Sequence, residues 1–259
     1  MTEFAELHAG PLPLFLPNAW DVPSALSFVA AGYRAIGTTS LGVAASHGVA
    51  DGGQATRESN LALARSLVRL PVLLSVDSED GYSDDPAEVA AYVAELAALG
   101  VVGVNLEDST AGRLVQPGAF AAKAAAVKQA APEVFVNARV DTYWFHQEDT
   151  PAETVARATA YVQAGADGIF VPGVDDPDLI RDLTDAVPVP VNILPVPGLS
   201  VTELVALGVR RVSTGSLPYR AALTAAVEAA AAARDGATLP ASVPYGELQA
   251  RLTTYADLA

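Results

Sequence analysis

The sequence contains no cysteine and little positive charge, and both absences limit what the protein can be. Without cysteine the chain forms no disulfide, no thiolate metal site and no cysteine nucleophile or acid. Its 15 Lys and Arg residues face 30 Asp and Glu residues, which gives a net charge of −15. This charge argues against nucleic acids and anionic membranes as partners. A metal ion and a few arginines can still reverse the sign locally, so an anionic substrate remains compatible.

Long hydrophobic runs are also missing. The apolar runs are far shorter than a membrane span, and the Ala-rich stretch 221–233 is interrupted by Glu228. The N-terminus lacks the basic and apolar pattern of a signal peptide, so we expect a cytoplasmic protein. The 259 residues are 51% hydrophobic and 17% charged, which suits one large core. We predict a single domain, 1–259, with a helical extension over 240–259.

Short apolar runs alternate with helical stretches along the chain. Strands are predicted at 12–16, 34–37, 72–76, 101–106, 133–137, 167–171, 189–194 and 209–213. Helices are predicted at 23–31, 55–69, 86–99, 117–130, 151–164, 176–186, 200–207, 217–234 and 245–257. About eight strand–helix units favour an α/β fold, a closed (β/α)₈ TIM-type barrel, with catalytic groups at the carboxyl ends of its strands. No G-x-G-x-x-G follows a strand, so a dinucleotide-binding fold has no support.

Acidic side chains follow two of the predicted strands. The stretch 71–82, PVLLSVDSEDGY, passes from a buried strand directly into acids. If the extended geometry continues, Asp77 and Glu79 point the same way, because side chains alternate along a strand. Another strand ends in Glu107. Acids can instead favour the start of the next helix, and this explanation suits 84–85. For the other three we favour a metal site, because Mg²⁺ or Mn²⁺ prefers oxygen ligands.

Two more charged residues are expected at the same edge of the barrel. Asp51 follows the second strand and could hold a water molecule of the metal, or could be an ordinary turn residue before two glycines. Arg139 follows the fifth strand, where a guanidinium can hold a substrate carboxylate through two parallel hydrogen bonds. The alternative for Arg139 is a salt bridge to Glu107 or Asp141.

Neutral and histidine side chains complete the candidate site. Ser40, Leu41 and Gly42 offer backbone N–H groups and a hydroxyl that can cradle a carboxylate, or they form an ordinary tight loop. Asn192 lies in an apolar strand and either faces the ligand or satisfies buried backbone. His47 lies in a loop and could move protons, although a loop histidine is usually just solvated.

Six segments together resemble the isocitrate lyase/phosphoenolpyruvate mutase superfamily. They run in order through most of the predicted barrel, and the set is far more specific than any one of them. The segments are LPNAWD (16–21), AIGTTSLGVAASHGVADG (35–52), VDSEDGYSDDP (76–86), GVNLEDS (103–109), VNARVD (136–141) and GADGIFVPG (165–173). The resemblance implies a Mg²⁺-dependent enzyme that makes or breaks a C–C or P–C bond in a small 2-keto or 2-hydroxy acid, through an enolate-like pyruvate.

The resemblance also assigns roles to residues. It implies that Mg²⁺ sits among Asp77, Glu79 and Glu107, mostly through water, with Asp51 nearby. It implies that the residues at 40–42 bind the substrate carboxylate with help from Arg139, and that Trp20 belongs to the substrate site. It further implies a homodimer or homotetramer that often exchanges a C-terminal helix, for which the stretch after Pro240 is the candidate.

The loop after Glu107 departs from several members of this superfamily. Isocitrate and methylisocitrate lyases carry a Lys-Lys-Cys-Gly-His loop that supplies a catalytic acid, whereas residues 108–113 are Asp-Ser-Thr-Ala-Gly-Arg. The longer gating loop of the mutases and phosphonopyruvate hydrolases is also missing. We therefore expect a lyase, decarboxylase or carbonyl hydrolase acting on an oxaloacetate-like or substituted malate-like acid.

Two hypotheses from other classes remain open at this point. A barrel without the familiar acid could bind a keto acid without turnover, as a sensor or scaffold. An unrelated aldolase could work through a Schiff base, for which the chain offers Lys123 and Lys128, both in a predicted helix.

Overall fold

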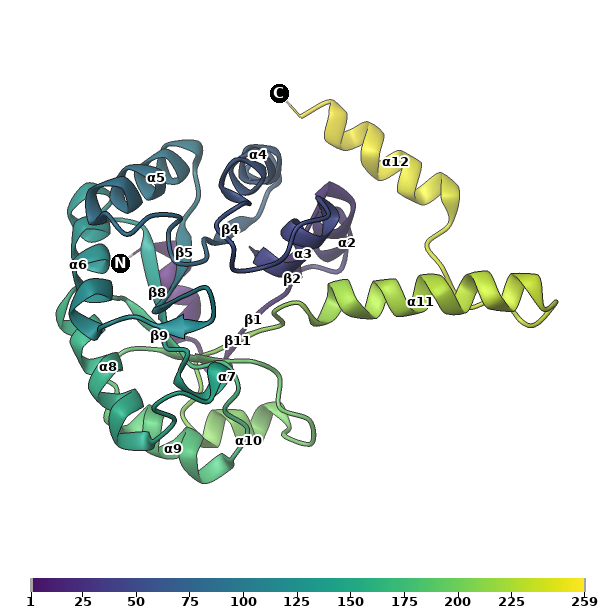
Figure 1. Cartoon of the computed structure of the whole chain (residues 1–259). Helices are drawn as coiled ribbons and strands as arrows, with labels where there is room; N and C mark the ends of the chain where they lie inside the picture. Colours follow the sequence, from purple (N-terminus) through teal and green to yellow (C-terminus); the bar gives the residue numbers. More distant parts are fainter. Residues whose placement is uncertain (1, 259) are drawn as a thin grey trace.

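A computed structural model describes residues 2–258 and shows a barrel of parallel strands surrounded by helices (Figure 1). Nine strand segments form one sheet in the order β1-β11-β10-β9-β8-β5-β4-β3-β2. The first two, β1 (Leu14–Leu16) and β2 (Asn18–Ala19), are pieces of one strand interrupted at Pro17. Because β1 pairs with β11 and β2 pairs with β3, the sheet closes with eight strands. The predicted (β/α)₈ barrel is confirmed.

Each predicted strand and long helix has a counterpart. The other barrel strands are β3 (Ala35–Thr38), β4 (Leu73–Asp77), β5 (Gly103–Glu107), β8 (Phe135–Arg139), β9 (Gly168–Phe170), β10 (Val191–Ile193) and β11 (Arg211–Ser213). The helices around them are α2 (Val22–Ala30), α4 (Arg57–Leu67), α5 (Pro86–Leu99), α6 (Pro117–Ala130), α8 (Pro151–Gln163), α9 (Pro177–Ala186) and α10 (Val201–Ala206). Proline begins four of these helices, where its missing N–H would have had no helical partner.

Several short elements were not predicted. Residues expected to form an exit loop instead form helix α3 (Ser40–Ser46). The loop after β5 contains a hairpin of β6 (Ser109–Thr110) and β7 (Arg113–Leu114), and α7 (Thr142–Phe145) follows β8. Each is too short to show a hydrophobic period in the sequence.

The barrel interior is apolar at one end and polar above it. The N-terminal elements α1 (Glu3–Glu6) and η1 (Leu7–Ala9) cover the amino ends of the strands, where Phe4 packs with Leu16 and Phe135. Further along the strands the buried side chains are polar, because alternation turns their apolar neighbours outward to the helices. This polar layer consists of Ser75, Asn105, Asn137, Asn192 and Arg211.

The last two helices behave differently from each other. Helix α11 (Leu217–Arg234) projects away from the barrel in Figure 1, while α12 (Tyr245–Ala256) returns to lie beside α2. Arg69 anchors the end of α12 by stacking on the Tyr255 ring at 4.6 Å and by donating to the carbonyl of Leu258. Helix α11 therefore leaves the barrel, while the stretch after Pro240 contacts it; exchange of a C-terminal helix between subunits stays a prediction. Within residues 2–258 no helix is long and apolar enough to cross a membrane.

Candidate functional site

A cavity of about 330 Å³ opens at the carboxyl ends of the barrel strands. The barrel strands and the loops that follow them form most of its wall. These contributors are Asn18, Ser40, Asp51, Asp77, Asn105, Arg139, Phe170, Leu194 and Ser213, and the mouth adds Trp144, Leu217 and Arg220. The cavity lies where a barrel of this type carries its chemistry.

Two carboxylates face this cavity. Asp77 ends β4, and one of its carboxylate oxygens accepts a hydrogen bond from the backbone N–H of Ser40 at 3.0 Å. Asp51 comes from the loop after α3, and burial together with the charge of Asp77 raises the pKa of its carboxyl. Mg²⁺ is usually bound by one or two carboxylates and keeps several waters. The donors present therefore fit Mg²⁺, which Asp77 and Asp51 would hold.

Glu79 follows Asp77 closely in the sequence but is not among the residues that line the cavity. The strand ends at Asp77 and the backbone of Glu79 has φ of +47°, so the alternation of side chains stops there. The Glu79 carboxylate is buried and accepts hydrogen bonds from the Thr56 hydroxyl and the Gln54 backbone. Burial raises the pKa of Glu79, and the charges of Asp77 and Asp51 add to this shift.

Glu107 is turned toward Arg139. The register pairs Glu107 with Arg139 on the adjacent strand, and their side chains form an ion pair of 2.7 Å. Burial raises the pKa of Glu107 well above its usual range, although Arg139 opposes the shift. Within residues 2–258 no three acidic or histidine side chains are close enough to hold one metal ion. The predicted Mg²⁺ site among Asp77, Glu79 and Glu107, with contacts mostly through water, stays a prediction; Glu79 and Glu107 feel the charges of Asp77 and Asp51 in this structure.

Arg139 lines the cavity, but it also forms the salt bridges that were its alternative explanation. Its Nη1 pairs with Glu107 and its Nε pairs with Asp141 at 2.6 Å. These two contacts leave Nη2 for a ligand. The guanidinium also stacks over the Trp144 and Phe170 rings, at 5.7 and 6.0 Å. Arg139 is thus a cation held in one orientation at the cavity wall.

Of the remaining predicted residues, some line the cavity and others pack behind its lining. Ser40 and Leu41 line the cavity. Gly42 lies behind them, where a Cβ would come within 2.8 Å of Trp20 and Thr39. Gly42 therefore allows α3 to pack against Trp20, and both residues stand outside the cavity lining.

Asn192 and His47 do not reach the cavity. Asn192 is 1% exposed and accepts a hydrogen bond from the Ser213 backbone N–H at 3.1 Å. It thereby satisfies buried backbone, which was the alternative to a ligand contact. His47 is exposed at the end of α3, and its Nδ1 lies 2.9 Å from the Val43 carbonyl.

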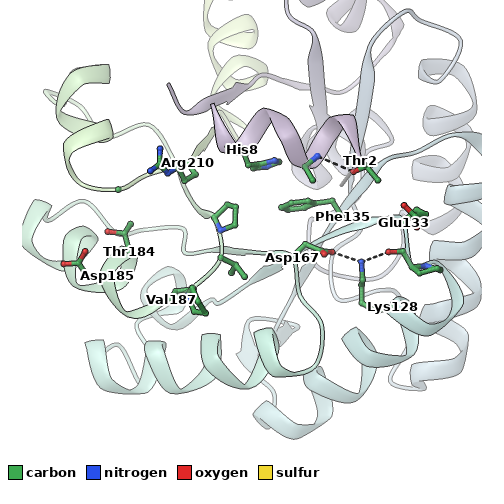
Figure 2. Close-up of a pocket in the computed structure, with 17 residues that line it drawn as sticks. Thr2, His8, Lys128, Glu133, Phe135, Asp167, Thr184, Asp185, Val187 and Arg210 are labelled. Carbon is green, nitrogen blue, oxygen red and sulfur yellow. Dashed lines mark hydrogen bonds and ion pairs between the residues drawn. The ribbon is translucent and has the colours of Figure 1, made fainter. Parts of the chain in front are cut away.

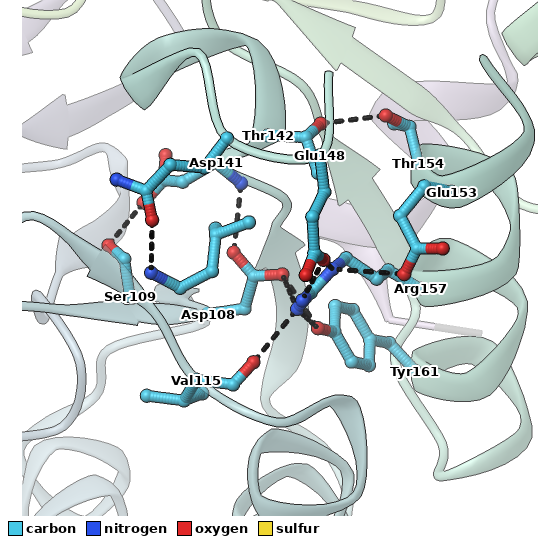
Figure 3. A network of polar contacts seen from close by, with 12 residues as sticks. Asp108, Ser109, Val115, Asp141, Thr142, Glu148, Glu153, Thr154, Arg157 and Tyr161 are labelled. Carbon is cyan, nitrogen blue, oxygen red and sulfur yellow. Dashed lines mark hydrogen bonds and ion pairs between the residues drawn. The ribbon is translucent and has the colours of Figure 1, made fainter. Parts of the chain in front are cut away.

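A buried polar network surrounds Asp108 and Asp141 (Figure 3), and Asp141 is the ion-pair partner of Arg139. Asp141 accepts from Ser109 at 2.6 Å, and its backbone N–H donates to Asp108 at 2.8 Å. Asp108 in turn accepts from the Tyr161 hydroxyl at 2.6 Å and from Arg157 at 3.2 Å. Burial raises the pKa of the Asp108 carboxyl to about 6. The network ties the loops after β5 and β8 to helix α8.

Several wall residues were missed by the sequence analysis. Asn105 carried the same signal as Asn192, a polar amide inside an apolar run, and could have been found in this way. Ser213 and Asn18 are small polar residues with no distinctive spacing. Trp144 and Arg220 depend on how α7 and the start of α11 are placed, which the sequence pattern does not reveal.

A larger cavity, of about 770 Å³, lies at the opposite end of the barrel (Figure 2). Lys128 in this cavity pairs with Asp167 at 2.8 Å and donates to two backbone carbonyls. Lys123 is buried, and its ammonium group donates to the Asp80 carbonyl at 3.0 Å. Neither lysine lines the smaller cavity, so this cavity offers no lysine to a Schiff-base aldolase.

Comparisons with known proteins agree with this geometry. The phosphoenolpyruvate phosphomutase family model matches residues 4–234. An uncharacterized protein of Mycobacterium tuberculosis (strain H37Rv) is 57% identical over 252 residues, 97% of this chain and 96% of that protein. The 2-methylisocitrate lyase of Bacillus subtilis is 33% identical, over 72% of this chain and 64% of the lyase. The oxaloacetate decarboxylase of Pseudomonas entomophila is 32% identical, over 66% and 60%. This chain thus spans less than two thirds of both enzymes.

Solved structures of similar proteins share the fold. A putative lyase/mutase from Burkholderia cenocepacia has a TM-score of 0.87 at 35% identity, covering 96% of this chain and 94% of that one. Phosphonopyruvate hydrolase, in a complex with oxalate and Mg²⁺, has a TM-score of 0.84 at 26% identity, covering 98% and 95%. Since the family model spans most of the chain, this protein belongs to the phosphoenolpyruvate phosphomutase family, in the superfamily that its six segments resemble.

Proposed function

We propose that this protein is a Mg²⁺-dependent enzyme that cleaves a C–C bond in a small 2-keto or 2-hydroxy carboxylic acid. The observation that carries the proposal is one cavity faced by two carboxylates, Asp77 and Asp51, and by the cation Arg139. Such a site can hold a metal ion and an anionic substrate side by side. Relatives named 2-methylisocitrate lyase and oxaloacetate decarboxylase support this reaction class.

The side chains of the cavity have distinct roles in this proposal. Arg139 binds a substrate carboxylate through its free Nη2, because Glu107 and Asp141 hold its other nitrogens. Ser40 holds Asp77 through its backbone N–H, and the backbone N–H of Leu41 beside it binds a carboxylate oxygen in the same cavity. Phe170 and Trp144 cover the reacting end and limit the access of water. When Mg²⁺ is bound, it supplies positive charge where the enolate develops.

Decarboxylation is the reaction that these residues favour most. Among the described residues, the titratable side chains on the wall are Asp51, Asp77, Arg139 and Arg220, with no Cys, Lys or His. Cleavage of a C–C bond in a 2-keto acid with a carboxylate on C3 leaves the electron pair as an enolate and releases CO₂. Water can then protonate the enolate carbon, so no dedicated acid is required. The likeness to an oxaloacetate decarboxylase supports this choice.

A substrate screen tests the proposal. The purified protein is incubated with Mg²⁺ and a panel of 2-keto and 2-hydroxy di- and tricarboxylates, beginning with oxaloacetate, and released CO₂, pyruvate, oxalate and glyoxylate are measured. We expect turnover that EDTA abolishes and Mg²⁺ restores. Asp77→Ala should lower the rate by roughly 100-fold or more, because it removes charge at the reacting centre.

The matched control is Asp84→Ala, which removes an exposed acid from the same loop outside the cavity. This variant should keep wild-type activity. Binding of oxalate without turnover of any acid in the panel would favour the non-catalytic keto-acid-binding barrel instead. We also propose that the chain works as a homodimer or homotetramer, because α11 leaves apolar side chains uncovered.

A further inference from the structure

An unpaired arginine is buried inside the barrel, below the cavity. Arg211 begins β11 and is 1% exposed. Within residues 2–258 it forms no ion pair, and its Nη1 has no hydrogen-bond partner. Its Nε donates to the Ser213 hydroxyl oxygen at 2.9 Å, and its Nη2 donates to Asn105 Oδ1 at 3.2 Å. A buried cation without a counter-charge costs stability, which suggests that it serves the site above it.

The contact with Asn105 decides which way that amide faces. Asn105 Oδ1 accepts from Arg211 Nη2 and also from Asn137 Nδ2 at 2.9 Å, which fills both of its lone pairs. A guanidinium can only donate, so it fixes the oxygen toward the barrel interior. The Nδ2 of the same planar amide points to the other side. Since Asn105 lines the cavity, its N–H groups become donors for a ligand there.

Arg211 also fixes the hydrogen-bonding role of the Ser213 hydroxyl. Its hydroxyl oxygen accepts from Arg211 Nε and from Asn192 Nδ2 at 3.0 Å. A hydroxyl has two acceptor positions and one proton. With both acceptor positions filled, the O–H is left to donate, and Ser213 also lines the cavity. Arg211 thus converts two neutral side chains of the cavity into hydrogen-bond donors.

We propose that Arg211 is a positioning residue that presents the Asn105 amide and the Ser213 hydroxyl as paired donors to an anionic oxygen, a carboxylate or enolate, of the bound acid. The proposal rests on the proposed function for the identity of that ligand. Burial lowers the pKa of Arg211 to about 9, so it remains a cation at neutral pH and attracts the anion as well. The negative charge of Asp77, which faces the same cavity, acts against this lowering of the Arg211 pKa.

Calorimetry with oxalate as the probe tests the proposal. Arg211→Met should weaken oxalate binding in the presence of Mg²⁺ by about tenfold or more, because the donors lose their fixed orientation and a charge is removed. Mg²⁺ affinity without oxalate should be unchanged or tighter, because a positive charge near the metal has gone. A merely structural arginine would weaken both. The matched control is Arg210→Met, one residue earlier at the opposite cavity, which should keep both affinities within twofold.

A second variant makes stability and binding move in opposite directions. Asn105→Asp places a carboxylate beside the unpaired guanidinium and removes the amide donors. We expect its melting temperature to rise by about 2–4 °C, while oxalate affinity falls at least tenfold. In the Arg211→Met background the same substitution should lower the melting temperature, because the new carboxylate has no cation.

The outcomes separate this inference from the proposed function. A folded Arg211→Met protein with wild-type oxalate affinity would overturn the inference. If Arg211→Met does not fold, two other variants replace it. Arg211→Lys must keep oxalate affinity within about threefold of the wild type, and Ser213→Ala must lower oxalate affinity at least fivefold. Any other pattern overturns the inference. If the wild type binds neither Mg²⁺ nor oxalate, the proposed function fails. The melting temperatures alone then test the orientation of Asn105. If Asn105→Asp lowers the melting temperature both in the wild type and in Arg211→Met, the proposed orientation is rejected.

Discussion

His8 is a neutral imidazole enclosed at the amino end of the barrel. It stacks on Phe135 at 4.4 Å, its Nδ1 lies 2.9 Å from the Phe4 carbonyl, and it is 2% exposed. A carbonyl can only accept, so Nδ1 carries the proton, and Nε2 is a buried acceptor with no partner among residues 2–258. Burial, with help from the charge of Arg211, lowers the pKa of His8 to about 3. The barrel end is therefore built for an uncharged histidine.

This environment predicts a stability that depends on pH. The folded pKa of about 3 lies below the ordinary value of 6.5, so the unfolded chain takes up the proton first as the pH falls. The free energy of unfolding should fall by up to about 1.4 kcal/mol per pH unit below pH 6.5 because of this residue. Urea denaturation from pH 7.5 to 5 measures it. His8→Phe should have a shallower slope than the wild type, whereas the exposed His47→Gln should match the wild type.

Some side chains of the site could be predicted from the sequence, and others could not. Asp51, Asp77 and Arg139 were found because each charged residue directly follows an apolar strand or its loop. Glu79 lies outside the cavity lining, and the left-handed backbone at that position ends the alternation from which its direction was predicted. Arg211 could not be distinguished from Arg210 by composition, since only the start of β11 determines which of the two points inward.

At the scale of elements, strands and long helices were predictable because each has an apolar run and a proline or glycine at its boundary. The helices 86–99, 117–130 and 217–234 have the predicted bounds. The hairpin of β6 and β7 had no such signal. It is held by tertiary contacts, in which Gln147 accepts from the Leu114 N–H and donates to the Gly112 carbonyl. Such contacts between distant loops leave no local pattern.

The network behind that hairpin should be a major source of stability. Arg157 is 2% exposed and is the cation that pairs with the buried Asp108. Arg157→Met should cost about 3–5 kcal/mol in the free energy of unfolding, because it leaves a buried carboxylate without its counter-ion. Urea denaturation measures the loss. Glu153→Gln, which changes a more exposed partner of Arg157 at 3.6 Å, should cost under about 0.5 kcal/mol.

A second substitution identifies the cause of that loss. Asp108→Asn removes the negative charge and keeps an oxygen that can accept from Tyr161 or the Asp141 backbone. The double variant of Arg157→Met and Asp108→Asn should recover part of the stability lost by Arg157→Met alone. A fully additive double variant would show that packing, and not the unpaired charge, is responsible.

At the scale of the whole molecule, α11 is the helix that does not pack along the barrel. It has 18 residues, and it extends into solvent with Leu223 53% and Val227 70% exposed (Figure 1). Most helical stability in proteins comes from packing of an apolar face. Residues 2–258 leave Leu223 and Val227 of this helix uncovered. Its first turn nevertheless contributes Leu217 and Arg220 to the mouth of the cavity. A second copy that covers α11 would therefore also steady the cavity mouth.

Light scattering after size-exclusion chromatography tests this assembly. The wild type should elute as a dimer or tetramer of the 26.6 kDa chain. Leu223→Gln combined with Val227→Gln should shift it toward the monomer, because both side chains would be buried only between copies, at about 1.5–3 kcal/mol each. Thr224→Gln is the control for an exposed polar position on the same helix, and it should leave the assembly intact. The dissociated variant should retain the barrel but lose activity, since the start of α11 loses its support. A wild type that is monomeric at all concentrations would contradict the assembly and would require α11 to be stable alone.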